Sequence, residues 1–146
     1  MNNLNCLINN LSKNFNKNNF IKLKEIVESY NGNDWKDNVS FNKNNYTRNK
    51  IFENENFNIF ILGWSENQES PIHNHPDNGC IMKILDGELI EELYNEDKVL
   101  LKKSLIKKNE VTYINNLIGV HKIINKNLKT VTLHLYSPPN FNMKIF

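Results

Sequence analysis

The spacing of hydrophobic residues divides the chain into a helical first third and a β-rich remainder. Between residues 20 and 30, Phe20, Leu23, Val27 and Tyr30 recur at intervals of three and four positions, as on one face of a helix. The turn-forming stretch 31–34 then ends this helix. We therefore expect the N-terminal part of the chain to be helical, in two or three pieces.

From about residue 46 onward, short runs rich in β-branched and aromatic residues alternate with turn residues, as in antiparallel proteins. The runs that we predict as strands are 57–64, 80–86, 88–94, 98–107, 111–114, 120–125 and 130–136. Asp86-Gly87 separates two of these runs and predicts a tight hairpin turn. The pattern predicts a mainly β sandwich or barrel at 46–139, with helices of 1–45 on one side and a short tail at 140–146, all in one domain.

Length and composition limit the classes of protein that this chain can be. At 146 residues it is long enough for a single domain, and its hydrophobic fraction of 39% can supply a core. No run approaches the ~18 apolar residues of a membrane span. The first six residues lack the basic start and apolar stretch of a secretory signal. We expect a cytoplasmic monomer with no membrane partner, in which Cys6 and Cys80 stay reduced.

The net charge of +2 gives no indication of a nucleic-acid partner. The one basic cluster, at 102–108, lacks arginine and interleaved aromatic residues, and it suits an edge strand protected by lysines. The chain has 30 asparagines and no alanine, a bias that an AT-rich coding sequence would produce. Against 17 lysines there is a single arginine, Arg48, so this residue is not a general source of positive charge.

All four histidines lie in the β-rich part of the chain. His73 and His75 are two positions apart, so in an extended segment their side chains point the same way. Neutral imidazoles that converge from neighbouring strands are natural ligands for iron, zinc, copper or nickel. Two polar surface histidines are the other interpretation, and the His-x-His pair alone does not decide between them.

The last predicted strand has one polar face. Along 130–136 the odd-numbered positions are apolar, whereas Thr132, His134 and Tyr136 occupy the opposite face. Polar groups buried without partners cost about 1–3 kcal/mol each, so a buried strand of this kind needs partners, which a metal pocket would supply. A half-exposed edge strand with an ordinary polar outer face would show the same pattern.

The spacing of these residues is similar to that of a known superfamily. His75 is followed after four residues by Cys80 and after six more by Gly87, and His121 is followed after three residues by Asn125. This resembles the two motifs of the cupin superfamily, small antiparallel β-barrels that hold a metal inside the barrel mouth. In the usual cupin motif a glutamate stands where this chain has Cys80. The resemblance therefore implies a metal site of three histidines and no carboxylate.

Within that superfamily, the chain resembles cysteine dioxygenase, a cupin thiol dioxygenase. The similarity runs from about residue 46 to 139 and is carried by seven short stretches. They are Tyr46-Thr47-Arg48-Asn49, Trp64, Pro71-Ile72-His73-Asn74-His75, Cys80-Ile81-Met82-Lys83 with Gly87, Tyr113-Ile114-Asn115, Ile118-Gly119-Val120-His121, and Leu133-His134-Leu135-Tyr136-Ser137-Pro138-Pro139. The resemblance implies Fe(II)-dependent addition of O2 to the sulfur of L-cysteine, giving cysteine sulfinic acid.

The resemblance also implies a role for each matching residue. The iron ligands would be His73, His75 and His121. Arg48 would bind the substrate carboxylate, and Tyr136 would place its hydroxyl near substrate and O2.

The remaining implied roles lie around that centre. His134 would orient Tyr136, and Cys80 would form the family's thioether crosslink to Tyr136. Tyr46 and Trp64 would line the pocket, and the Ser137-Pro138 peptide would be cis.

Arg48 also fits the carboxylate role on chemical grounds, because a guanidinium grips a carboxylate with two parallel hydrogen bonds that lysine cannot copy. Related enzymes that prefer mercaptopropionate carry glutamine at the arginine position and lack the cysteine, so Arg48 and Cys80 favour cysteine as substrate. Two alternatives stay open. One is a dioxygenase for another small thiol, such as mercaptopropionate or cysteamine, and the other is a metal- or ligand-binding cupin without turnover.

Overall fold

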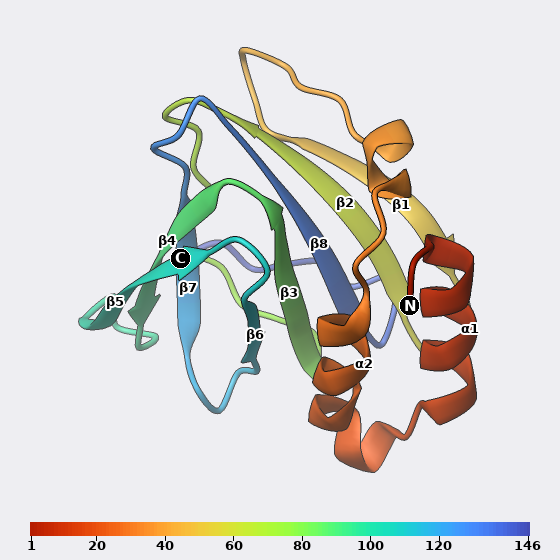
Figure 1. Ribbon diagram of the computed structural model, residues 1–146. Coiled ribbons are helices and arrows are strands. Elements are labelled where there is room, and N and C mark those ends of the chain that lie inside the picture. Colours follow the sequence, from red (N-terminus) through yellow and green to blue (C-terminus); the bar gives the residue numbers. More distant parts are fainter.

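Two antiparallel sheets form most of the protein, and the helical segments lie outside them (Figure 1). The structure is a computed structural model that describes residues 1–146. The helical segments are α1 (Leu4–Asn14), the 3-10 segment η1 (Lys17–Leu23), α2 (Lys24–Ser29) and the 3-10 segment η2 (Asp34–Asn38). The strands are β1 (Thr47–Glu53), β2 (Asn58–Ser65), β3 (Gly79–Asp86), β4 (Glu88–Tyr94), β5 (Leu100–Lys107), β6 (Val111–Ile114), β7 (Val120–Ile124) and β8 (Lys129–Ser137). None of the helices has the length and apolar character needed to cross a membrane.

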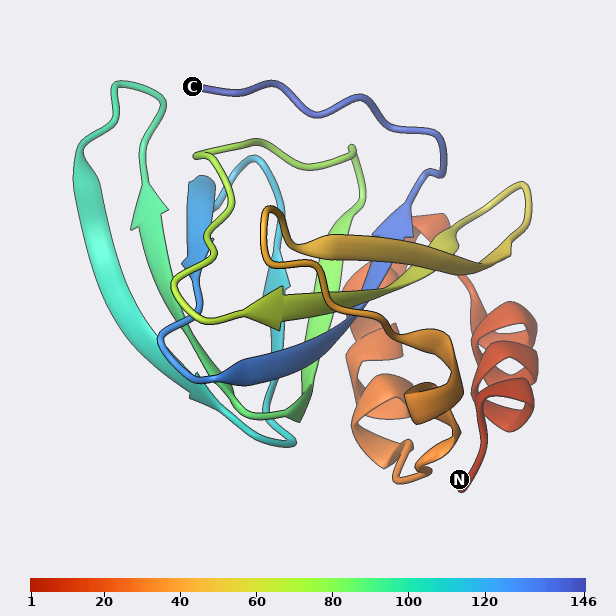
Figure 2. The ribbon, with the colours of Figure 1, turned by 90° about the horizontal axis from the view of Figure 1, so that it is seen from above.

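The strands are distributed over a five-stranded sheet, β1-β2-β8-β3-β6, and a three-stranded sheet, β5-β4-β7. Figure 2 shows the two sheets facing each other, with the C-terminal segment running along one side of them. The mainly β, antiparallel fold with helices on one side agrees with the prediction from the sequence. Lysines 102 and 103 lie exposed on β5, an outer strand of the smaller sheet, as expected for a protected edge.

Strand β1 was not predicted from the sequence. Four of its seven residues are exposed, because β1 forms an outer edge of the five-stranded sheet and pairs with β2 alone. An edge strand of this kind carries no alternation of apolar and polar residues, which is the signal that identifies a strand. The omission matters because β1 carries Arg48.

The predicted hairpin at Asp86-Gly87 is wrong. β3 pairs with β6 and β8, whereas β4 pairs with β5 and β7, so the two strands that flank Gly87 belong to different sheets. Gly87 has φ +81°, and a Cβ there would collide with the Thr130 hydroxyl oxygen. The glycine therefore forms a corner that takes the chain from one sheet to the other.

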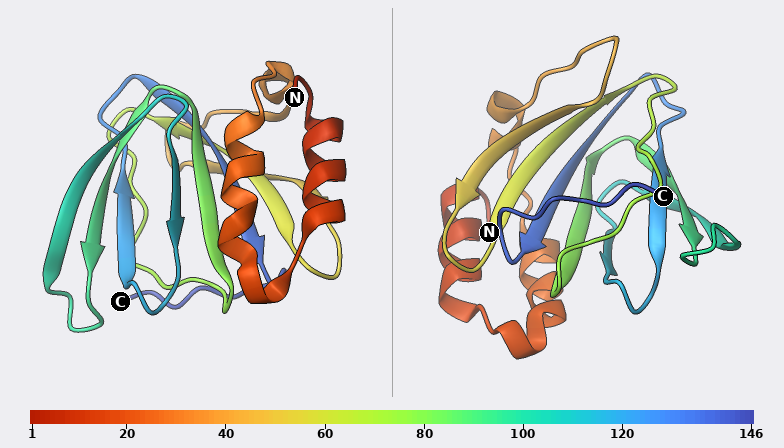
Figure 3. Two further views of the ribbon diagram at one scale, coloured as in Figure 1. Left: turned by 60° about the horizontal axis from the view of Figure 1, so that its bottom comes forward. Right: turned by 180° about the vertical axis from the view of Figure 1, so that it is seen from behind.

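The helices bury their apolar faces against the outer face of the five-stranded sheet (Figure 3). Leu4, Leu7 and Leu11 recur at helical spacing on α1 and are buried, as is Val27 on α2. They form one core with sheet residues that point toward the helices, among them Ile59, Ile61, Ile81, Leu133 and Leu135. The apolar face of β8 thus packs under the helices, and its polar face is left for the space between the sheets.

One lysine is buried in this helix–sheet core. Lys83 on β3 is 3% exposed, and its ammonium donates to the backbone carbonyls of Val27, Glu28 and Tyr30. These carbonyls lie at the end of α2, where the last turn of a helix leaves acceptors without partners. Lys83 therefore fastens the C-terminal end of α2 to the sheet.

Candidate metal centre and substrate pocket

His73, His75 and His121 come together between the two sheets. Their ligating nitrogens all lie within 4.8 Å of one another. The segment that carries His73 and His75 precedes β3, while His121 is on β7. Two backbone hydrogen bonds join the segments, from the His73 nitrogen to the His121 carbonyl (3.0 Å) and from the His121 nitrogen to the His73 carbonyl (3.1 Å).

Hydrogen bonds on the far side of two rings decide which nitrogens face the centre. His73 Nδ1 lies 2.8 Å from the Pro71 carbonyl, and His121 Nδ1 lies 2.8 Å from Oε2 of Glu91. A carbonyl or a carboxylate can only accept, so both Nδ1 atoms carry the proton and both Nε2 atoms carry a lone pair. The two Nε2 atoms are 3.2 Å apart and face each other with no proton between them. A cation beside both lone pairs would satisfy them.

The electrostatic setting also fits a metal. Both ring nitrogens of His75 are buried without a hydrogen-bond partner. Burial lowers the pKa of all three histidines, and for His75 the neighbouring His121 and His73 lower the pKa further. The imidazoles are therefore held in the neutral form that binds metals. The three residues fit a divalent cation, and the cluster is a metal-binding site.

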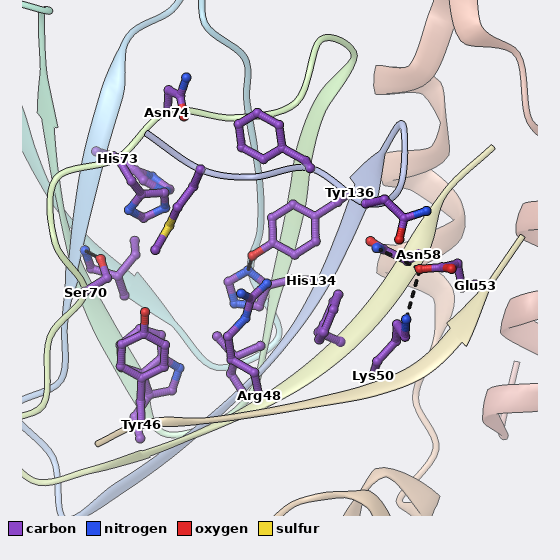
Figure 4. Close-up of a pocket in the computed structure, with 18 residues that line it drawn as sticks. Tyr46, Arg48, Lys50, Glu53, Asn58, Ser70, His73, Asn74, His134 and Tyr136 are labelled. Atoms are coloured by element: carbon purple, nitrogen blue, oxygen red, sulfur yellow. Dashed lines mark hydrogen bonds and ion pairs between the residues drawn. The ribbon is translucent and has the colours of Figure 1, made fainter. Parts of the chain in front are cut away.

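The metal site opens into a cavity of ≈ 170 Å³ that also contains Arg48. The Arg48 side chain points toward His134 and Tyr136 (Figure 4). Its guanidinium carbon lies 4.6 Å from the ring centroid of Phe60 and 5.8 Å from that of Tyr136. No protein carboxylate forms an ion pair with it. The cavity thus contains an uncompensated guanidinium near the three histidines, and its size suits a ligand smaller than the drug-sized molecules of typical pockets.

A chain of hydrogen bonds starts at Trp64 on β2 and runs along the neighbouring strand β8 to the hydroxyl of Tyr136. Trp64 Nε1 donates to Thr132 Oγ1 (3.0 Å), Thr132 Oγ1 lies 2.8 Å from His134 Nε2, and His134 Nδ1 lies 3.1 Å from the Tyr136 hydroxyl. Thr132 has no other side-chain hydrogen bond, so its proton goes to His134 Nε2. His134 then donates from Nδ1, where the Tyr136 oxygen lies at 3.1 Å and Cys80 Sγ at 3.9 Å, and the Tyr136 oxygen that accepts this bond keeps its own proton to donate.

Cys80 and Tyr136 face each other directly across the pairing of β3 with β8. Cys80 is 3% exposed, and burial raises the pKa of its thiol. Burial also raises the pKa of Tyr136. Both groups are therefore protonated at neutral pH, and Cys80 stands apart from the three-histidine cluster.

Comparison with known proteins identifies the family. A family model described as cysteine dioxygenase type I matches residues 4–146. The chain belongs to the cysteine dioxygenase family. Cysteine dioxygenase type 1 of Danio rerio is 36% identical over 137 residues, which cover 86% of this chain and 68% of that protein. The type 1 proteins of Bos taurus and Homo sapiens are each 36% identical over 129 residues, covering 81% of this chain and 64% of theirs. The chain thus spans about two thirds of the length of these relatives.

Solved structures at low sequence identity show the fold of this cysteine dioxygenase family member. A Klebsiella pneumoniae protein with a double-stranded β-helix domain has a TM-score of 0.64 at 16% identity, covering 75% of this chain and 86% of that one. TT1209 from Thermus thermophilus has a TM-score of 0.62 at 16% identity, covering 73% and 95%. An RmlC-like cupin from Desulfovibrio desulfuricans has a TM-score of 0.52 at 19% identity, covering 67% and 88%. The predicted cupin barrel is confirmed.

In this cysteine dioxygenase family member, the aromatic residues expected in the pocket stack on each other. The rings of Tyr46 and Trp64 are 4.4 Å apart and nearly parallel, and both line the cavity. Trp64 is fully buried, and burial raises the pKa of Tyr46. The Ser137-Pro138 peptide bond is cis, as the family resemblance implied.

Two parts of the site were missed in the sequence. One is Glu91, behind His121, and the other is the tail 140–146, of which Asn140, Phe141 and Met143 line the cavity. Leu89, Glu91 and Leu93 are two positions apart and therefore lie on the same face of β4. A charged residue between two apolar ones on that face was a signal in the sequence for a functional glutamate. The tail offers no such pattern.

The tail is paired with the segment that carries His73. The Asn74 nitrogen donates to the Lys144 carbonyl (3.2 Å), the Lys144 nitrogen donates to Asn74 Oδ1 (2.7 Å), and the Phe146 nitrogen donates to the Ile72 carbonyl (2.9 Å). From behind, the tail crosses from the end of β8 toward β7 (Figure 3). The His73 segment therefore lies between the tail and β7.

Proposed function

We propose that this protein is a cysteine dioxygenase that adds both atoms of O2 to the thiol of L-cysteine and forms cysteine sulfinic acid. The reaction is balanced without an external reductant, because one thiol and one O2 give one sulfinic acid. The observation that carries the proposal is a three-histidine site of which His73 and His121 line the same small cavity as an unpaired arginine. The family assignment supports the same activity.

Arg48 binds the substrate carboxylate in this proposal. Its guanidinium is available because no protein carboxylate pairs with it, and it can form two parallel hydrogen bonds with a carboxylate. Its distance to the rings of Phe60 and Tyr136 supports a fixed orientation of the cation over aromatic faces. A substrate carboxylate held there would leave the thiol end to reach the histidines.

His73, His75 and His121 hold the metal, which we propose is Fe(II). When bound, Fe(II) supplies the coordination positions and the redox chemistry that join a thiolate to O2. All three protein ligands are neutral, so the charge of the dication is left for an anionic group of the substrate, and a coordinating thiol is deprotonated. Because the protein ligands carry no negative charge, the metal favours a substrate that binds as an anion, such as a thiolate.

Tyr136 supplies a hydroxyl to the substrate and O2, and His134 orients it. The hydrogen bond from His134 Nδ1 to the tyrosine oxygen supports this role, because it leaves the tyrosine proton to be donated into the cavity. Tyr46 forms part of the substrate wall beside this hydroxyl. Cys80 forms a thioether crosslink to Tyr136, a role that their direct pairing across β3 and β8 supports. The new bond between sulfur and a ring carbon replaces the S–H bond and one ring C–H bond, and O2 accepts the two electrons and two protons that are released.

L-cysteine and O2 are the partners that the proposal requires. The cytoplasmic location, the monomeric state and the lack of a nucleic-acid or membrane partner stay predictions from the sequence.

The experiment that tests the proposal is an anaerobic titration of the Fe(II)-loaded protein with L-cysteine, followed by exposure to O2 labelled with 18O. Mass analysis should find cysteine sulfinic acid that carries two labelled oxygen atoms. Retained iron with no O2 uptake would favour a cupin without turnover. Faster oxidation of mercaptopropionate or cysteamine than of cysteine would favour a dioxygenase for another thiol.

A further inference from the structure

A partly buried carboxyl group lies directly behind the three-histidine site. Glu91 on β4 places Oε2 2.8 Å from His121 Nδ1, and the two side chains are only 17% and 6% exposed. Glu91 shares the inward face of β4 with Leu89, which belongs to the core between the sheets. The adjacent Glu92 lies on the opposite face of β4, where it accepts from the Tyr94 hydroxyl, and its side chain is 16% exposed.

No lysine or arginine forms an ion pair with Glu91, and Lys102 on β5 acts on it only at longer range, lowering the pKa of Glu91 against the larger raising effect of burial. Of the lysines on the neighbouring strands, Lys103 lies 3.7 Å from Glu92 and Lys122 lies 2.8 Å from Glu69. The only hydrogen-bond partner of the Glu91 carboxylate is the His121 ring. A buried carboxylate with one neutral donor is costly unless a positive charge lies nearby. A cation bound at Nε2 of His121 would supply that charge.

The three histidines differ in what stands behind them. His73 is backed by the neutral Pro71 carbonyl, and neither ring nitrogen of His75 has a protein partner. His121 alone is backed by a carboxyl group, and burial raises the pKa of this group while Lys102 lowers it. A carboxylate bonded to the remote nitrogen of a histidine fixes the tautomer and makes the other nitrogen a stronger donor.

We propose that Glu91 is a positioning residue that acts through His121, where it keeps Nε2 free to bind and raises the affinity of the site for a divalent metal. With three neutral ligands, Glu91 supplies the only negative protein charge beside the centre, one imidazole ring away from it. It therefore adds attraction for the cation without occupying a coordination position. The inference rests on the metal site of the proposed function but not on cysteine as the substrate.

The test compares Glu91→Gln with Glu92→Gln in the metal-free protein. Glutamine keeps the shape of the side chain and can still accept from His121 Nδ1, so the first variant removes the charge alone. The second variant removes a carboxylate from the opposite face of the same strand. Affinity for Co(II), used as a spectroscopically visible divalent probe, is measured by competition with a chelator. We expect Glu91→Gln to bind Co(II) about 10- to 100-fold more weakly, with altered visible absorption bands, and Glu92→Gln to match the wild type.

Equal Co(II) affinity of folded Glu91→Gln and wild type would overturn the inference. A measurement on the unchanged protein covers the case in which the variant does not fold. The 15N chemical shifts of His121 report which ring nitrogen is protonated in the metal-free wild type, and an unprotonated Nδ1 would also refute the inference. Cysteine oxidation does not enter either readout. If Glu91 controls Co(II) affinity but the Fe(II) protein does not oxidise cysteine, only the proposed function fails, whereas a wild type that binds no Co(II) refutes both.

Discussion

Replacing Arg48 by glutamine removes the only guanidinium of the protein from a cavity that holds no carboxylate partner for it. The side chain lies against the rings of Phe60 and Tyr136 at the open side of the cavity, on the edge strand β1. If Arg48 binds the substrate carboxylate, the variant should lose affinity for carboxylated thiols and keep its affinity for thiols without a carboxylate.

The expected loss follows from the type of bond. A hydrogen bond to a charged group contributes about 1.5–3 kcal/mol, and Arg48 lies partly in solvent, which screens the interaction. We therefore assign about 2–3 kcal/mol to the whole guanidinium–carboxylate pair, below the sum of two full bonds. At 1.36 kcal/mol per tenfold change, the Kd for cysteine should rise about 30- to 150-fold.

The assay is anaerobic titration of the Fe(II)-loaded proteins with L-cysteine and with cysteamine, which is cysteine without its carboxylate. The ratio of the two Kd changes isolates the effect of the carboxylate, because any general damage from losing the contact between Arg48 and Tyr136 weakens the binding of both thiols equally. Lys50→Gln is the matched control, since Lys50 also lines the cavity but is paired with Glu53 at 3.1 Å. A similar loss for cysteine and cysteamine in Arg48→Gln would refute the carboxylate role.

Three further predictions concern stability and covalent chemistry. Metal-free protein should lose stability below about pH 6.5. Burial lowers the pKa of the three ligand histidines in the folded state, whereas histidines of the unfolded chain titrate near 6.5, so below this pH the unfolded state binds more protons. Burial lowers the pKa of His134 as well, so all four histidines act in the same direction, and urea titrations at pH 7 and 5.5 should differ by roughly 1 kcal/mol per histidine, about 4–5 kcal/mol in total. A flat profile would contradict this. Aerobic incubation with Fe(II) and cysteine should produce a second electrophoretic band that Cys80→Ser abolishes, whereas a single band throughout would argue against the crosslink to Tyr136. Lys83→Met should lower the free energy of unfolding by about 2–3 kcal/mol, because the carbonyls at the end of α2 lose their donor, and an unchanged urea midpoint would show that they find other partners.

Periodicity predicted the fold class because most strands bury one face and expose the other. Strand β8 is the clearest case, since its apolar positions lie under the helices and Thr132, His134 and Tyr136 point between the sheets. Strand β1 was not predicted because a largely exposed edge strand does not need to alternate apolar and polar residues. The corner at Gly87 was taken for a hairpin because the local sequence is the same whether the next strand joins the same sheet or another one.

The site depended on contacts that local sequence does not contain. The shared direction of His73 and His75 follows from their spacing, but His121 lies 48 residues beyond His73 and meets it through a backbone bridge. Only the similarity to a known family placed it with the other two. Glu91 and Lys83 were missed although each is a charged residue among apolar neighbours of the same parity, a pattern that marks a buried charge with a specific partner.

Residues 143–146 pack against the segment that carries His73, so the docking of the tail and the binding of the metal are energetically coupled. Linkage is reciprocal, so whatever free energy the docked tail adds to the affinity for the cation, the bound cation must add to the docking of the tail. A protease or a binding partner that captured this segment would therefore also weaken the hold on the metal, without touching any of its ligands.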